Sequence, residues 1–61
     1  MNPVEIKEIR MKLGLSQEAF AHLIGVTFGT INRWERGAFK PSRLAVEQIK
    51  ALMNKKKVKN D

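Results

Sequence analysis

Three side chains with strong hydrogen-bonding capacity lie close together in the chain, at Asn32, Arg33 and Arg36. A guanidinium group is a charged fork of hydrogen-bond donors, and an amide both donates and accepts. In a helix, positions 32 and 36 share one face and position 33 lies beside them. Such a set can bind planar, acceptor-rich or anionic groups, but it contains no nucleophile and no general base.

Residue types for catalysis or metal binding are sparse elsewhere. The chain has one histidine, His22, and no cysteine, so we expect no metal site and no disulfide. No Ser/His/Asp set, glycine-rich phosphate loop or pair of carboxylates at active-site spacing is present, and so small a core leaves no room for a substrate cleft. The sequence therefore predicts a protein that is not an enzyme and uses no cofactor or small-molecule ligand.

The net charge of +6 is concentrated in one half of the chain. Residues 1–26 carry three basic and three acidic side chains, whereas residues 27–61 carry nine basic and three acidic ones. Four of the nine basic residues are lysines of the C-terminal tail, and a solvated tail alone would explain these four. Without them, residues 27–61 still contain five basic and three acidic residues. This asymmetry favours a polyanionic partner.

The length of 61 residues limits the chain to one domain with a small hydrophobic core. It contains no apolar run of about 18 residues and no basic-then-apolar leader pattern. We therefore expect a soluble, cytoplasmic protein with no membrane partner.

Four helices are predicted, over roughly residues 3–13, 17–24, 28–36 and 42–53. Each of the first three begins after a capping side chain and ends at a glycine, which can take the left-handed conformation. The caps are Asn2, Ser16 and Thr27, and the glycines are Gly14, Gly25 and Gly37. Beyond residue 54 no apolar periodicity remains to be buried, so we expect residues 1–54 to form the domain and residues 55–61 a disordered basic tail.

The predicted core consists of apolar side chains at helical spacing. Its members are Ile6, Ile9, Leu13, Ala19, Phe20, Leu23, Ile24, Ile31, Trp34, Ala45, Val46, Ile49, Leu52 and Met53. Phe39 is expected to anchor the loop before the fourth helix to this core. Ala21 is small where the second and third helices must approach closely, and Gly25 can take the positive φ of the sharp turn between them.

At these positions the sequence resembles the phage repressor and Cro-like (XRE-type) family of helix-turn-helix DNA-binding domains. The resemblance rests on LSQEAFA at 15–21, GV at 25–26, TI at 30–31 and WERG at 34–37, and it covers about residues 5–53. It implies an all-α, lambda-repressor-like domain of four or five helices that binds duplex DNA. No segment of this chain is patterned as the fifth helix, and that part of the family often holds two copies together, so a homodimer on a pseudo-palindromic site stays open.

The residues that would read DNA bases lie on the outer face of the third helix. A helical wheel places Phe28, Gly29, Asn32, Arg33 and Arg36 within an arc of about 140°. Arg33 can bind guanine O6 and N7, Asn32 can pair with adenine, and Phe28 can contact a thymine methyl. Gly29 either lets the backbone approach the groove or is simply tolerated. Thr30, although on the opposite arc, completes the set of base-contacting candidates.

Simpler interpretations of the same residues remain. Arg33 and Arg36 can be solubilising charges, and Asn32 can face solvent or sugar-phosphate. Phe28 is either a surface probe or a lid over the edge of the core, and we favour the probe because other side chains already fill the inward side.

A second set of residues is expected to hold the phosphate backbone, in contacts that position the protein without specifying sequence. Its members are Gln17, Thr27, Arg36, Lys40 and Arg43. In the family, the glutamine at the start of the second helix binds phosphate and buttresses the third helix. Arg10 and Glu35 match a family ion pair between the first and third helices, so loss of Arg10 should affect folding as well as binding.

These features predict a sequence-specific, double-stranded DNA-binding transcriptional regulator, and we favour a repressor. One alternative is a protein-interaction module, such as an antitoxin or adaptor, that binds through Phe28, Phe39 or the fourth helix. The basic excess around the third helix argues against it. Another is the targeting domain of a methyltransferase or controller protein, against which Met1 and the complete four-helix pattern weigh.

Overall fold

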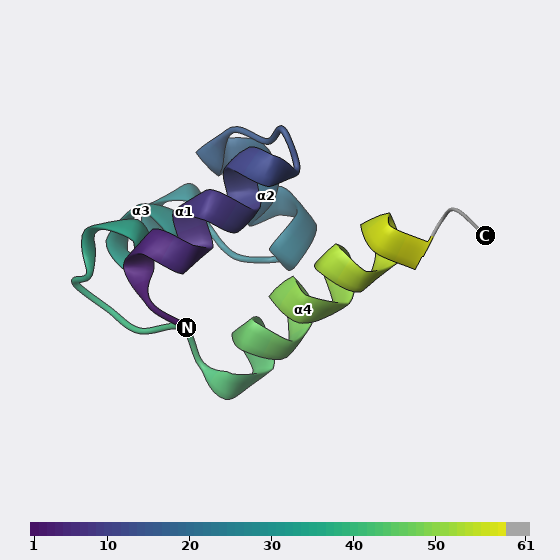
Figure 1. The fold of residues 1–61 in the computed structure, drawn as a ribbon. Coiled ribbons are helices and arrows are strands. Elements are labelled where there is room, and N and C mark those ends of the chain that lie inside the picture. The colour runs from purple at the N-terminus through teal and green to yellow at the C-terminus, as the bar shows by residue number, and fades with distance from the viewer. Residues whose placement is uncertain (59–61) are drawn as a thin grey trace.

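The computed structural model describes residues 1–58, and the side chains of residues 1–55. This part of the chain forms four helices and no strand: α1 (Pro3–Lys12), α2 (Gln17–Ile24), α3 (Phe28–Arg36) and α4 (Arg43–Val58) (Figure 1). The predicted all-α, four-helix architecture is confirmed. None of the helices within residues 1–58 is long and apolar enough to cross a membrane.

The first three helices begin at the predicted caps. Asn2 and Glu5 form a reciprocal capping box, in which each side chain accepts a hydrogen bond from the backbone amide of the other, at 2.8 and 2.9 Å. Ser16 accepts from the amide of Ala19, and Thr27 accepts from the amide of Thr30. These bonds satisfy amides that have no partner inside the helix, so they set where each helix starts.

The core draws side chains from all four helices, which explains why so short a chain can close on itself. Its buried members are Ile6, Phe20, Ala21, Ile24, Ile31, Trp34, Ala45 and Ile49. Five further apolar side chains pack around this cluster half-buried, namely Ile9, Leu13, Leu15, Val26 and Leu52. Burial of apolar surface is the main driving force of folding, and this cluster supplies it.

The turn between α2 and α3 depends on Gly25. Its φ of +88° is left-handed, which costs any other residue type free energy. The amides of Gly25 and Val26 both donate to the Ala21 carbonyl, at 2.9 and 3.0 Å, so the chain turns sharply within two residues of the end of α2. Ala21, whose carbonyl accepts these two bonds, is only 3% exposed.

Phe39 does not anchor its loop to the core, as the sequence had suggested, because it is 64% exposed. The amides of Ala38 and Phe39 both donate to the Arg33 carbonyl, which holds the loop on the surface at the end of α3. Trp34, 5% exposed, already fills the adjacent core. Phe39 instead lines a groove together with Met1.

Leu23 was also expected in the core and is 52% exposed. The buried positions of α2 are Phe20, Ala21 and Ile24, which span an arc of about 100°. Leu23 lies about 60° outside that arc, which explains why it is only partly covered.

The last helix is longer than expected, since α4 continues to Val58 instead of ending near residue 54. Its C-terminal end extends beyond the other three helices (Figure 1). Lysine is a good helix former, and basic side chains are favourable near a helix C-terminus, so the helix can continue past the last apolar position predicted from the sequence. The rest of the expected tail, residues 59–61, lies outside the described residues.

Candidate nucleic-acid interface

The two sides of α3 separate as the helical wheel predicts. Ile31 and Trp34 are buried at 0% and 5% exposure and fix the helix to the core. On the other side, Phe28 is 52% exposed and Arg33 and Arg36 are exposed as well. Gly29 and Asn32, between them on this outer arc, are half-buried. The structure therefore brings all five predicted members of the arc to one surface.

Thr27 and Thr30 form a pair at the N-terminus of α3. Their hydroxyl oxygens lie 2.9 Å apart, and the Thr27 hydroxyl also accepts from the Thr30 amide at 3.2 Å. Thr30 is half-buried, so it is less accessible than Phe28 beside it. The pair places two hydroxyl groups at the helix end where the dipole favours a negative charge.

The Arg33 guanidinium group lies over Gly29, one turn back along α3. A Cβ atom at Gly29 would sit 3.7 Å from Nη1 and 3.8 Å from Nη2 of Arg33. These are ordinary van der Waals distances, so the guanidinium group lies over the bare backbone of Gly29 but does not depend on the absence of a side chain there. No carboxylate among residues 1–55 pairs with Arg33, which keeps its donors available.

Asn32 and Arg36 form a second pair on the same face, one turn apart. The Arg36 Nε atom donates to Asn32 Oδ1 at 2.8 Å. The spacing of four positions is the one at which side chains of a helix meet, so the sequence carried the signal for this bond, although we did not predict it.

A polar network behind α3 holds the helix against the rest of the domain. Arg10 donates to both carboxylate oxygens of Glu35, from Nε to Oε2 at 2.7 Å and from Nη2 to Oε1 at 3.1 Å. Its remaining Nη1 donates to the Leu15 carbonyl at 2.9 Å. Gln17, the first residue of α2, donates from Nε2 to Glu35 Oε1 at 3.0 Å. Glu35 thus connects α3 to both α1 and α2.

Burial and hydrogen bonding act in opposite directions on the Glu35 carboxylate. The side chain of Glu35 is 5% exposed and that of Arg10 is 13% exposed. Burial raises the pKa of Glu35, but the hydrogen bonds from Arg10 and Gln17, together with nearby positive charge, outweigh it and leave that pKa below its ordinary value. The hydrogen bond to Glu35 raises the pKa of Arg10. Both groups are therefore charged near neutral pH.

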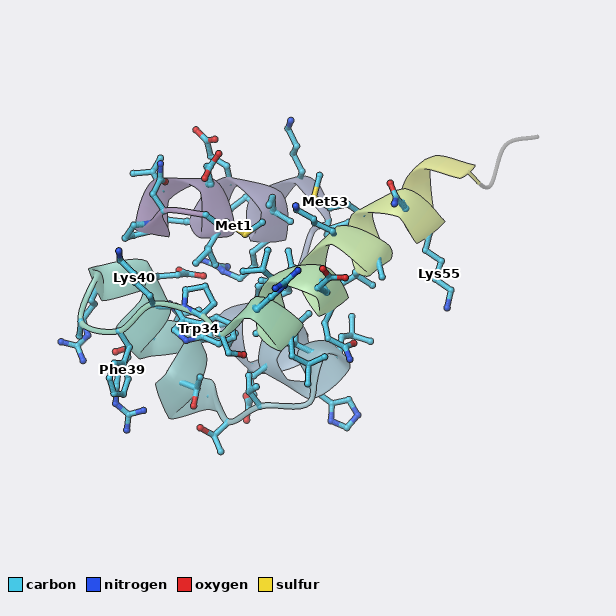
Figure 2. All side chains as sticks on the ribbon, turned by 90° about the horizontal axis from the view of Figure 1, so that it is seen from below. Met1, Trp34, Phe39, Lys40, Met53 and Lys55 are labelled. Atoms are coloured by element: carbon cyan, nitrogen blue, oxygen red, sulfur yellow. The ribbon has the colours of Figure 1, made fainter. Side chains whose placement is uncertain are left out.

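The loop after α3 and the start of α4 carry the remaining predicted contacts. Lys40 and Arg43 are exposed, and the Ser42 hydroxyl accepts from the Ala45 amide at 3.1 Å to begin α4. Figure 2 shows Phe39 and Lys40 together on this loop, at the opposite end of the molecule from Lys55. The lysine at position 55 therefore belongs to a different surface from the loop.

Residues 6–57 match a family model described as helix-turn-helix, and this range contains all of α2 and α3. The chain belongs to the helix-turn-helix family. The XRE-type resemblance inferred from the motifs around α2 and α3 is thereby confirmed. A curated relative from Methanothermobacter thermautotrophicus, an uncharacterised HTH-type transcriptional regulator, is 34% identical over 55 residues, which cover 90% of this chain and 80% of that protein. No solved structure matches the chain significantly.

Within this helix-turn-helix domain, α2 and α3 are the two helices of the motif and the residues around Gly25 are its turn. Motif helices of this kind must keep a fixed mutual angle, and two features do so here. Ala21 permits close packing at the turn, and the bond from Gln17 to Glu35 joins the two helices on the surface side.

Proposed function

We propose that this protein is a sequence-specific, double-stranded DNA-binding transcriptional regulator that places α3 in the major groove. The observation that carries the proposal is the division of α3 into a buried edge and an exposed edge of base-reading residues. The helix-turn-helix family match and the name of the curated relative support it. A regulator of transcription works where the DNA lies, so the proposal includes a cytoplasmic location.

The exposed edge of α3 supplies the base contacts. Arg33, seated over Gly29, has the donor geometry for guanine O6 and N7. Phe28, 52% exposed at the first position of the helix, offers apolar surface to a thymine methyl group. Asn32 lies between them on the same arc. Thr30 contributes its methyl group or hydroxyl at the edge of this set.

Phosphate contacts flank the exposed edge on both sides. Gln17 uses one Nε2 hydrogen for Glu35 and retains a second for a phosphate oxygen near the positive end of the α2 dipole. Thr27 offers its hydroxyl at the start of α3. Arg36 donates from Nε to Asn32, so its two terminal nitrogens remain for a phosphate. Lys40 and Arg43 bind the phosphates beyond the end of α3.

A single copy offers few base contacts, so two copies on a pseudo-palindromic site fit the proposal best. The half-sites would then lie about one helical turn, roughly 34 Å, apart. Such a dimer would cover a promoter and act as a repressor. Dimerisation adds base contacts without enlarging a domain whose core is already small.

The exposure of Phe39 favours one competing function, a protein-interaction module such as an antitoxin or adaptor. An aromatic side chain that is 64% exposed on a loop is a candidate contact for a protein partner. The same loop carries Lys40, and the adjacent helices carry Arg36 and Arg43. This density of positive charge favours DNA as the partner of the whole surface.

Selection of bound duplexes from a random pool tests the proposal. We expect a two-fold symmetric motif, and Arg33→Ala should relax one position of each half-site at a cost of about 1 to 3 kcal/mol. Arg43→Ala is the matched control, since loss of a phosphate contact should weaken every site alike. Failure to enrich any sequence, together with normal folding of the protein, would contradict sequence-specific binding.

A further inference from the structure

We infer that Asn32 reads a base through its amide donor alone, and that Arg36 is the residue that positions it. This inference deepens the proposed function and rests on it, because it concerns which base α3 selects. It starts from the hydrogen bond from Arg36 Nε to Asn32 Oδ1, at 2.8 Å. Both residues lie on the exposed arc of α3, and neither belongs to the network around Glu35.

The chemistry of the pair settles the orientation of the amide. A guanidinium group can only donate hydrogen bonds, so the atom of Asn32 that faces it must be the oxygen. Arg36 follows Asn32 by one turn, which directs Oδ1 along α3 toward the C-terminal end of the helix. Nδ2 therefore points away from Arg36, and the side-chain hydrogen bonds among residues 1–55 leave its two hydrogens unengaged.

This orientation conflicts with the two-bond contact between an asparagine and adenine. That contact needs the amide oxygen to accept from the adenine N6 amino group while the amide nitrogen donates to N7. In this protein the oxygen already accepts from Arg36 and faces along the helix, so only the donor reaches outward. An adenine N6 amino group at that place would face Asn32 Nδ2, so two hydrogen-bond donors would meet.

Guanine suits the outward donor better, because its major-groove edge offers two acceptors, N7 and O6, and no amino group. Arg33, the next residue of the chain, is also a pure donor. The exposed edge of α3 thus presents donors at both positions. We assign guanine as the base that Asn32 prefers, and the adenine contact expected from the sequence is replaced by this one.

The experiment measures base preference at the position that Asn32 contacts, which is the position relaxed by Asn32→Ala in duplex selection. For the wild type we expect guanine to exceed adenine in affinity by about five-fold, the effect of one hydrogen bond. In Arg36→Met the amide is free to rotate, so this ratio should fall to about one or reverse. Arg43→Met is the matched control, because it removes an exposed positive charge but should leave the ratio unchanged.

Duplexes with modified bases give a second readout. Replacing guanine by 7-deazaguanine at that position removes the N7 acceptor and should weaken wild-type binding. Replacing adenine by purine removes the N6 amino group, and the wild type should bind adenine no more tightly than purine. A wild-type preference for adenine, or a ratio that Arg36→Met leaves unchanged, overturns the inference while sequence-specific binding through Arg33 stands. A selection that enriches no sequence overturns the proposed function itself.

Discussion

Glu35 is the side chain on which the arrangement of the candidate interface depends. It accepts hydrogen bonds from Arg10 on α1 and from Gln17 on α2, so three helices meet at one carboxylate. A charged group at 5% exposure is stable only when such partners compensate its lost hydration. The network therefore couples the position of α3 to the stability of the domain.

Acid should weaken the domain through Glu35. Because its folded pKa lies below the unfolded value, the stability it contributes is complete above the unfolded value, about 4.3, and is lost as the pH falls through the folded value. Glu35→Gln should lower the free energy of unfolding by about 2 kcal/mol at pH 7 and should flatten its decline below about pH 4.3. Urea unfolding at pH 7, 5, 4 and 3 measures both effects.

The matched control for this experiment is Glu47→Gln, an exposed carboxylate on α4 outside the network. It should keep the wild-type dependence on acid. The account of Glu35 is wrong if Glu35→Gln declines with acid as steeply as the wild type does.

At the scale of the elements, the N-terminal turn of α3 combines a weak helix former with the Arg33 side chain. Gly29 has a helical conformation, and a Cβ atom there would meet only ordinary contacts, the nearest at 3.7 Å. Folding therefore does not require glycine at this position. Either Gly29 is simply tolerated, or the reason for it lies on the outer face, where DNA would approach.

Gly29→Ala should separate folding from binding. We expect it to raise the free energy of unfolding by about 0.5 kcal/mol, since alanine is the better helix former. The added methyl group would lie on the outer face and keep the backbone from the groove, so affinity for the selected duplex should fall by about ten-fold. Thermal unfolding and fluorescence anisotropy measure the two quantities.

Gly25→Ala is the control with the opposite profile. Its φ of +88° makes alanine unfavourable there, so this variant should lose about 1 kcal/mol of stability. An unchanged DNA affinity in Gly29→Ala would show that Gly29 is merely tolerated, which is the simpler of the two interpretations of this glycine.

The boundaries of the first three helices could be predicted from the sequence because local chemistry sets them. Asn2, Ser16 and Thr27 cap amides within their own turn, and Gly25 meets a conformational demand of its own residue. The outer arc of α3 followed from helical periodicity in the same way.

The errors arose where burial depends on what other elements cover. Leu23 is as apolar as the core residues, but about half of its surface stays exposed on its side of α2. Phe39 is as apolar as Phe20, yet Trp34 already occupies the core beside its loop. The residues that neighbour Leu23 and Phe39 in the sequence do not predict this exposure. The end of α4 was missed for another reason, since lysines extend a helix without any apolar pattern.

At the scale of the whole molecule, the distribution of charge agrees with an anionic partner. All of the net charge of +6 falls in residues 27–61, which include α3, the loop with Lys40, and α4. The loop lies at the opposite end of the molecule from Lys55 (Figure 2). The positive surface that we propose to meet DNA is thus distinct from the basic end of α4.

Salt should weaken DNA binding in proportion to the phosphates neutralised. If Arg36, Lys40 and Arg43 each neutralise one phosphate, the log of the affinity should fall with the log of the salt concentration with a slope of about −2.7 per bound copy. Arg43→Ala should reduce the magnitude of this slope by about 0.9. Fluorescence anisotropy titrations of the duplex at salt concentrations between about 50 and about 300 mM measure this slope. A flat response would favour a protein partner instead.

The central claim is that the exposed edge of α3 enters the DNA groove, and a nuclear magnetic resonance titration with the selected duplex tests it most directly. The account predicts large shifts for the amide signals of residues 28–36 and for the side-chain signals of Asn32 and Arg33, while Glu47 and Lys50 on α4 stay unmoved. Shifts confined to α4, with residues 28–36 unchanged at saturation, would contradict it.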